Sequence, residues 1–207
     1  MKRSTRNAAR TKREIIEKSA PVFNVHGYAG TKMQMLVDAT GYQMGGIYRH
    51  FETKMDLAKA AFQYNYETLI KSNFELKEKL SPKEKVLTIL QNYKKMALKP
   101  VIPGGCPLLN TAIEVDDTDE GFRQLTQSAV REVIKMMEQI LEEGKASGSF
   151  NPKINPKKEA QYLFASIEGA IMLSRITRDK APFIEIFEKA ISYFEKNIVL
   201  EKMDRRL

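Results

Sequence analysis

The segment from Gln43 to Phe51 combines residue types that suit contact with a nucleic acid. Its sequence is QMGGIYRHF. If the segment is a short helix, Ile47 and Phe51, four positions apart, form its buried side. The residues left for its outer side are Gln43, Met44, Gly45, Tyr48, Arg49 and His50. Small residues permit close approach, polar groups read base edges and donors bind phosphates, so this face favours DNA recognition.

A second short helix is expected just before this segment. We expect it to follow Thr31, whose side chain would cap it, and to reach Ala39. Gly41 would then take the positive φ of the turn. Two short helices around such a turn form a helix-turn-helix. An ordinary helical hairpin within a bundle explains the turn equally well, so the turn alone does not decide between them.

The stretch from Arg13 to Phe62 resembles the DNA-binding domain of the TetR family of transcriptional repressors. The matching residues are Ile16, Ala20, Phe23, Gly27, Tyr28, Thr31, Ala39, Gly41, the block GGIYRHF at 45–51, Lys54 and Leu57. These residues span much of the stretch at several fixed spacings, which makes a chance match improbable. The resemblance therefore favours the helix-turn-helix over the ordinary hairpin.

The resemblance implies an all-α dimer with a three-helix DNA-binding head and a divergent ligand-sensing body. It also implies that Lys54 contacts phosphate and that Tyr48 and His50 contact the DNA backbone. We therefore expect the DNA-binding residues to be Thr31, Gln43, Met44, Gly45, Tyr48, Arg49, His50 and Lys54. The sequence departs from the family pattern at Gln43, where the family usually has a Ser or Thr that caps the recognition helix.

Beyond the head, the sequence is rich in methionine and aromatic residues at helical spacing. Deformable thioethers and flat rings suit an adaptable apolar pocket, although plain core packing explains any one of them as well. We expect the ligand-binding residues to be Tyr64, Tyr93, Met96, Cys106, Asn110, Met137 and Phe164. Glu114, which follows Asn110 by one turn, is a further polar candidate.

Cys106 lies in the sequence GGCPLLN, just before a predicted helix. A helix N-terminus favours the reactive thiolate. The arrangement resembles that of some members of the same family that sense electrophiles and oxidants. The alternative is an inert, buried thiol, which is common among single cysteines.

Helical periodicity runs through almost the whole sequence, without the two-residue alternation of a half-buried strand. Glycine and proline divide it into about nine helices, so we expect an all-α fold. The expected helices are 4–26, 31–39, 43–50, 53–79, one beginning at Ser81, 108–115, a long one after the sequence DDTDE, 157–177 and 182–200. We expect a helix-turn-helix DNA-binding domain at 1–53 and a ligand-sensing and dimerisation domain at 54–207.

The composition narrows the classes of function. The chain has 207 residues and a net charge of +8, and its first 60 residues hold eleven Lys or Arg against five Asp or Glu. This concentration of positive charge suggests a polyanionic partner at that end. There is no phosphate-binding glycine loop, paired-histidine metal motif or nucleophile elbow, so we expect no enzyme, no cofactor and no metal. A single cysteine and the lack of any long apolar run favour a cytoplasmic protein with no membrane partner.

Assembly and function follow from these features. A single helix-turn-helix makes too few contacts for tight operator binding, so we expect a homodimer. Ala165, Gly169 and Ala170 would allow close helix approach, and the last helix carries an apolar stripe that could equally be buried within one subunit. We expect a ligand-responsive transcriptional repressor, released from a palindromic double-stranded DNA operator by a small hydrophobic or reactive molecule. The alternatives are a redox- or electrophile-sensing regulator acting through Cys106, and a DNA-binding protein without an effector.

Overall fold

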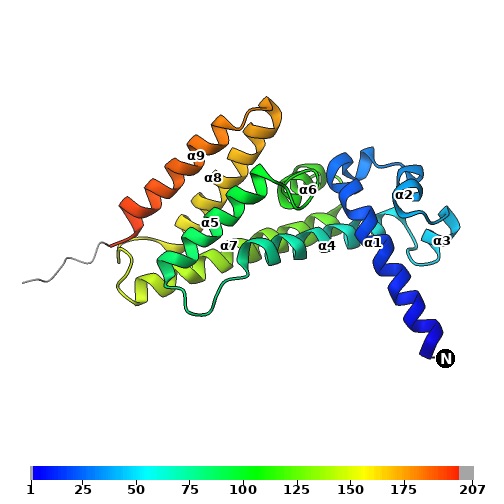
Figure 1. Cartoon of the computed structure of the whole chain (residues 1–207), viewed down its shortest axis with the longest axis horizontal. Coiled ribbons are helices and arrows are strands. Elements are labelled where there is room, and N and C mark those ends of the chain that lie inside the picture. The colour runs from blue at the N-terminus through cyan, green and yellow to red at the C-terminus, as the bar shows by residue number, and fades with distance from the viewer. Residues whose placement is uncertain (1, 201–207) are drawn as a thin grey trace, which may run out of the picture. The chain divides into compact units, whose positions relative to one another are not determined.

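The computed structural model describes residues 2–200, with side chains from residue 7 onward. Within this range the chain forms nine α-helices, and its only β-structure is an isolated bridge. The helices are α1 (Lys2–Gly30), α2 (Met33–Thr40), α3 (Met44–Tyr48), α4 (Lys54–Phe74), α5 (Pro82–Leu98), α6 (Pro107–Val115), α7 (Glu120–Ala146), α8 (Pro156–Thr177) and α9 (Ala181–Tyr193) (Figure 1). The predicted all-α fold is confirmed.

The chain divides into two compact units. The first contains the residues up to Leu69 together with Pro100–Ala129, and the second contains Ile70–Lys99 and the residues from Val130 onward. Helices α4 and α7 contribute residues to both units. These units are defined by how compactly the chain packs. The boundary that we expected after residue 53 separates DNA binding from ligand sensing and dimerisation, so it stays a prediction.

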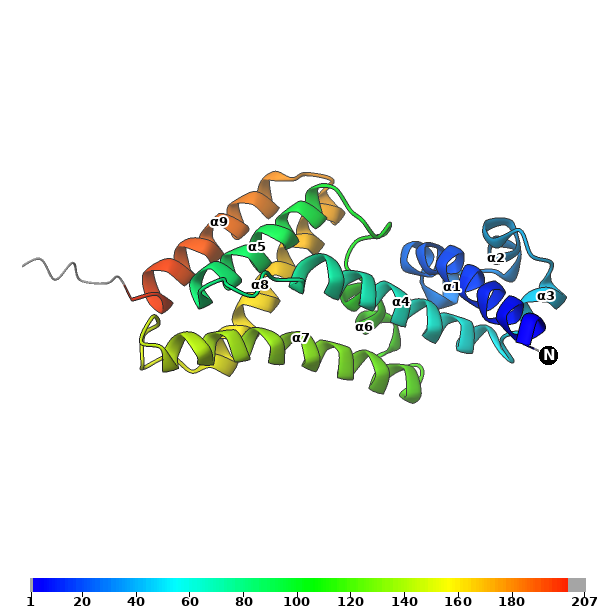
Figure 2. The same ribbon diagram turned by 60° about the horizontal axis from the view of Figure 1, so that its bottom comes forward.

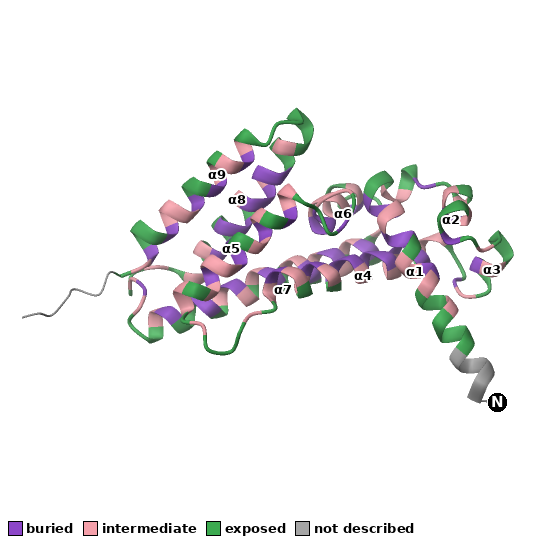
Figure 3. Ribbon diagram, viewed as in Figure 1, coloured by how far each residue is buried: buried purple, intermediate pink, exposed green. Residues whose placement is uncertain are grey.

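The first unit is organised around α1, which packs against α2 and α6. The helical backbone of α1 breaks at Gly27, where φ is 69° and ψ is 173°. L-residues with a side chain rarely adopt this conformation, so Gly27 kinks the helix at the residue where the sequence predicted its end, and the helix resumes for the few residues up to Gly30. The core beside α1 includes Leu36 from α2 and Leu57 from α4, both fully buried. Figure 3 shows in purple where the buried residues of each helix lie. The ring of Phe62 meets that of Phe122 edge to face, with centroids 5.6 Å apart.

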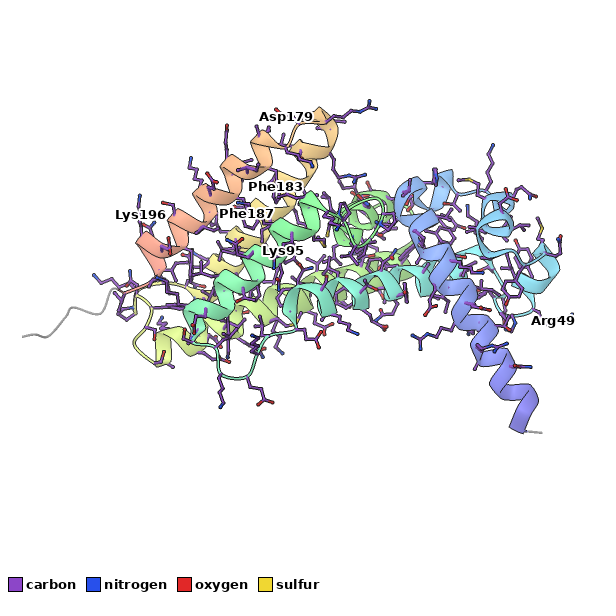
Figure 4. All side chains as sticks on the ribbon, viewed as in Figure 1. Arg49, Lys95, Asp179, Phe183, Phe187 and Lys196 are labelled. Atoms are coloured by element: carbon purple, nitrogen blue, oxygen red, sulfur yellow. The ribbon has the colours of Figure 1, made fainter. Side chains whose placement is uncertain are left out.

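The second unit is organised around α9, which packs against α8 and α5 (Figure 2). Phe183 and Phe187 lie on the inner side of α9 with ring centroids 5.2 Å apart (Figure 4). The last predicted helix, 182–200, is longer than the observed α-helix. From Phe194 to Ile198 the chain forms a π-helical turn, and Val199 then pairs with Phe150 in the isolated bridge.

Two features expected at a dimer interface are instead buried within the second unit. Phe183, Phe187 and Phe194 are each at most 1% exposed, so the apolar stripe of the last helix packs inside the subunit. This was one of the two alternatives that the sequence left open. Ala170 is also fully buried, whereas Ala165 is exposed. The expectation that Ala170 allows close helix approach at a dimer interface is therefore wrong, because its side chain packs inside the subunit.

Candidate nucleic-acid interface

Helices α2 and α3 form a helix-turn-helix. Gly41 ends α2 with φ 75°, and its N–H donates to the carbonyl oxygen of Val37 at 2.9 Å, as in a left-handed C-cap. Leu36 from α2 and Ile47 from α3 are at most 1% exposed. Because these two side chains fix the inner faces of the helices, they also fix which residues of α3 remain outside.

The start of α2 differs from the prediction. Its N-cap residue is Lys32, so Thr31 does not cap this helix. Thr31 is 1% exposed, and both its N–H and its hydroxyl donate to the carbonyl oxygen of Gly27. The hydroxyl therefore closes the turn that precedes α2. A contact between Thr31 and DNA stays a prediction.

The outer face of α3 carries most of the predicted DNA-binding residues. Those exposed are Gln43, Met44, Gly45, Tyr48 and Arg49, and His50 is half-buried. Met44 and Tyr48 expose 44% and 41% of their surface, a large amount for apolar or aromatic side chains. Arg49 follows the last residue of α3 (Figure 4). The side chain of Gln43 makes no capping hydrogen bond to α3.

No neighbouring group inside the protein requires a glycine at position 45. A Cβ atom added there would have no heavy atom within 4 Å apart from the local backbone. Glycine also weakens a helix relative to alanine. The folded chain therefore gives no reason for glycine at this position, whereas close approach to a DNA groove would.

Side chains of α1 hold the helix-turn-helix in place. The Nζ of Lys18 donates to the carbonyl oxygen of Thr40 at 3.1 Å, at the end of α2. The hydroxyl of Tyr42, in the turn, donates to the Glu14 carboxylate at 2.7 Å. This hydrogen bond to a carboxylate raises the pKa of Tyr42. The orientation of α3 is thus tied to α1 on both sides of Gly41.

The described basic residues of the head are mostly exposed. They include Arg10, Lys12, Arg13, Lys18, Lys32 and Arg49. Arg13 pairs with Glu17 at 2.7 Å, and Lys12 lies 5.2 Å from the centre of the Phe51 ring. An exposed pair within one helix contributes little free energy, so it leaves Arg13 able to bind phosphate.

Lys54 points into the head. Its Nζ donates to the carbonyl oxygen of Tyr28 and lies 4.3 Å from the centre of the Tyr28 ring. Burial lowers the pKa of Lys54, and the negative charge of Glu114 partly opposes this change. Lys54 therefore already has partners within the protein, and its contact with phosphate stays a prediction.

Two family models match the chain. The model described as "Bacterial regulatory proteins, tetR family" matches residues 15–61, which contain the helix-turn-helix. The model described as "Tetracyclin repressor-like, C-terminal domain" matches residues 82–190, which is more than half of the chain. The chain belongs to the TetR family. It is therefore a DNA-binding transcriptional regulator, and the resemblance seen in the sequence is confirmed.

Solved TetR-family structures share the fold over nearly the whole of this TetR regulator. A TetR transcriptional regulator from Chloroflexus aurantiacus J-10-FL is 32% identical, with a TM-score of 0.87 over 95% of this chain and 100% of that chain. One from Cytophaga hutchinsonii is 34% identical, with a TM-score of 0.83 over 94% and 98%. The HTH-type transcriptional repressor DhaR from Mycobacterium sp. strain GP1 is 26% identical over 190 residues, or 90% of this chain and 95% of DhaR.

The predicted ligand-binding residues are divided between the two compact units. Tyr64, Cys106 and Asn110 belong to the first unit, and Tyr93, Met96, Met137 and Phe164 belong to the second. All four residues of the second unit are buried, and Tyr93 meets the ring of Phe74 edge to face at 6.2 Å. They are part of an apolar core, and a pocket shared by all seven stays a prediction.

The first unit contains a cavity that the sequence did not predict. Its empty volume is about 290 Å³, which includes space open to solvent. It is lined by Phe23, Asn24, Tyr28, Ala58, Phe62, Asn65, Thr111, Glu114 and Phe122. None of the seven predicted ligand-binding residues is among them. Glu114, which we expected as a polar pocket residue, is present.

Asn110 is hydrogen-bonded to α1 and to the loop before α6. Its Nδ2 donates to the carbonyl oxygen of Asn24 at 3.0 Å and to that of Gly104 at 2.9 Å. The Nδ2 of Asn24 in turn donates to the carbonyl oxygens of Pro103 and Gly105 at 2.7 and 3.0 Å. The two asparagines therefore fasten the loop before α6 to α1. Asn24 was missed in the sequence because one amide on a helix carries no spacing signal.

Cys106 is the N-cap residue of α6, at the predicted junction of loop and helix, and its side chain makes no capping hydrogen bond. The residue is 0% exposed. The sulfur is therefore not accessible to an electrophile in solution in this structure.

The described part of the chain holds no helix that is both long and apolar enough to cross a membrane. Among residues with described side chains, no three His, Cys, Asp or Glu are grouped as a metal site would require.

Proposed function

We propose that this regulator represses transcription by binding a palindromic DNA operator through α3, and that a small hydrophobic or reactive effector releases it. The outer face of α3 carries the proposal, because it exposes polar and aromatic groups beside a glycine that the fold does not need. Gln43 and Arg49 offer amide and guanidinium groups for base edges. The proposed DNA-contacting set is Thr31, Gln43, Met44, Gly45, Tyr48, Arg49, His50 and Lys54.

The operator would be bound by a homodimer, and α8 supports this assembly. Tyr162, Ala165, Met172 and Ile176 are exposed along α8 and, with the half-buried Gly169 between Ala165 and Met172, follow one another at spacings of three and four. Leu173, next to Met172, is exposed as well. Ile176 is 78% exposed, and a Cβ atom added at Gly169 would meet nothing within 4 Å. An exposed apolar stripe of this length is typical of an interaction surface. Two copies joined along α8 would present two recognition helices to two half-sites.

The effector would bind within the body, among residues that are mostly buried and apolar. The proposed residues are Tyr64, Tyr93, Met96, Cys106, Asn110, Met137 and Phe164. The effector must bind the DNA-incompetent state more tightly than the DNA-bound state, since only differential affinity shifts the equilibrium. Thermal unfolding with a panel of hydrophobic compounds tests this point, because a ligand that binds the folded protein raises its melting temperature. A protein that no compound stabilises would favour a DNA-binding protein without an effector.

Selection from a library of random DNA duplexes tests operator binding directly. The wild-type protein should enrich an inverted repeat whose half-sites are centred about one helical turn, or ~10 base pairs, apart or a multiple of that spacing. Affinity for the selected DNA should fall steeply with salt, because phosphate contacts release counterions. Enrichment of no motif would refute sequence-specific operator binding.

Sensing through Cys106 is the less well supported alternative, because the thiol is fully buried. If Cys106 is the trigger, electrophiles should release DNA from the wild-type protein but not from the C106S variant. Equal release from both proteins would show that the thiol is structural and that the reversible effector is the one to pursue.

A further inference from the structure

Glu114, near the end of α6, holds the turn that joins α1 to α2. Its two carboxylate oxygens accept hydrogen bonds from the N–H groups of Tyr28 at 2.7 Å and Ala29 at 2.8 Å. Successive backbone N–H groups that converge in this way form an anion-binding concavity. Hydrogen bonds to a charged acceptor are also stronger than those between neutral groups. The carboxylate is therefore a strong link between α6 and this turn.

Gly27 makes the approach of Glu114 possible. A Cβ atom added at Gly27 would lie 2.8 Å from both carboxylate oxygens of Glu114, closer than such atoms come in proteins. The positive φ of Gly27 separately disfavours any side chain there. The same residue thus kinks α1 and leaves the space that the carboxylate fills.

The turn is held from a second side by α4. The carbonyl oxygen of Tyr28 accepts a hydrogen bond from Lys54, while its N–H is bound by Glu114. The hydroxyl and N–H of Thr31 donate to the carbonyl oxygen of Gly27. These two hydrogen bonds fix the last residues before α2 against the kink at Gly27. The peptide groups from Gly27 to Thr31 are therefore fixed by side chains from α6, α4 and the turn itself.

We propose that Glu114 is a positioning residue for DNA binding, which fixes the turn at residues 27–31 and thereby the orientation of α2 and α3. Asn110, one turn earlier on α6, binds the Asn24 carbonyl, so α6 is fastened to the end of α1 at two points. Movement of α6 away from α1 would break the hydrogen bonds of Glu114 and loosen the DNA-binding head. This inference rests on the proposed operator binding by α3. Glu114 itself does not touch DNA.

The test compares E114Q and E114D with the wild-type protein. E114Q removes the charge and turns an amide NH₂ toward one backbone donor, and E114D keeps the charge but shortens the side chain. Each should weaken operator binding by about tenfold, the effect expected when a charged hydrogen bond is lost. Removing a negative charge would by itself strengthen binding to DNA. The loss expected for E114Q therefore has the opposite sign to the simple electrostatic effect.

Asp117→Asn is the matched control, because Asp117 is exposed and lies three residues away. It should bind the operator at least as tightly as the wild-type protein. Amide hydrogen exchange supplies a readout that a general loss of stability would not mimic. In E114Q the Tyr28 and Ala29 amides should exchange at least about tenfold faster, while amides in the core of α8 keep their protection.

Two results would overturn the inference. One is operator affinity in E114Q and E114D equal to that of the wild type, whether or not exchange at Tyr28 and Ala29 changes. The other is that the Tyr28 and Ala29 amides of the wild-type protein exchange as fast as those of an unstructured peptide. This measurement needs no variant, so it applies even if both variants misfold. If the wild-type protein selects no operator at all but these amides are protected, operator binding fails while the Glu114 contact stands.

Discussion

Gly45 of α3 is a residue that folding does not require but that we expect DNA binding to require. Its backbone is helical and an added Cβ atom would meet nothing, so alanine fits the folded protein. We predict that G45A raises the free energy of unfolding by about 0.5–1 kcal/mol, because alanine is the better helix former. The same variant should bind its operator several-fold more weakly, since a methyl group would stand between α3 and the groove. Chemical denaturation and fluorescence anisotropy measure the two effects.

G46A is the matched control for this prediction. An added Cβ at Gly46 makes an ordinary contact with Tyr42 at 3.8 Å, so it adds helix propensity on another side of α3. G46A should gain stability and lose less affinity than G45A. Equal affinity of G45A and the wild type would contradict the assignment of this face to DNA.

At the scale of residues, several contacts of the head were not predictable from the sequence. The exposed set on α3 was predictable because Ile47 and Phe51 mark its buried side four positions apart. The surroundings of Lys54 were not, because Tyr28 lies 26 positions before it and Glu114, whose charge acts on it, lies 60 positions after it. A contact between helices that are distant in sequence leaves no periodic signal. Thr31 was assigned to a cap of α2, whereas its hydroxyl donates to the carbonyl oxygen of Gly27, four positions earlier, where the backbone leaves the helical conformation.

At the scale of elements, the end of α7 needs a glycine at position 144 for packing, unlike position 45, where the fold accepts a side chain. A Cβ atom added at Gly144 would overlap the ring of Phe150, which is itself fully buried against Phe194 with centroids 5.5 Å apart. We predict that G144A lowers the free energy of unfolding by about 1–3 kcal/mol, the usual cost of overpacking a core. Chemical denaturation of G144A beside G45A checks this, because both changes replace a helical glycine by alanine. A G144A protein as stable as the wild type would refute the packing argument.

The helices themselves were largely predictable, and their ends were less so. The start of α5 was predicted correctly from Ser81 and Pro82, since Ser81 is its N-cap and accepts a hydrogen bond from the Glu84 N–H. The last helix was predicted too long. Its π-helical turn and the pairing of Val199 with Phe150 arise from tertiary packing, which local periodicity does not report.

At the scale of the whole molecule, the dimer should depend on the exposed stripe of α8. We predict that I176E makes the protein monomeric at micromolar concentration, because a carboxylate would be buried without a partner at the interface. Since Ile176 is 78% exposed in the single chain, the subunit should remain folded. Light scattering gives the mass, and circular dichroism checks the fold.

I113E is the matched control for the dimer. Ile113 is 65% exposed on α6, so the chemical change is identical but lies off the α8 stripe. I113E should remain a dimer. A wild-type protein that is monomeric without DNA, or an I176E protein that stays dimeric, would rule out assembly through α8.

The most direct test of DNA reading by α3 is the motif that the R49A variant selects from random duplexes. Loss of a guanidinium contact to a base edge should relax the preference at one position of each half-site and weaken binding to the wild-type operator by about tenfold or more. R131A, which removes the same charge from an exposed position on α7, should select the wild-type motif with nearly the wild-type affinity. An R49A protein that selects the wild-type motif with wild-type affinity would contradict the assignment of Arg49 and of the α3 face to base recognition.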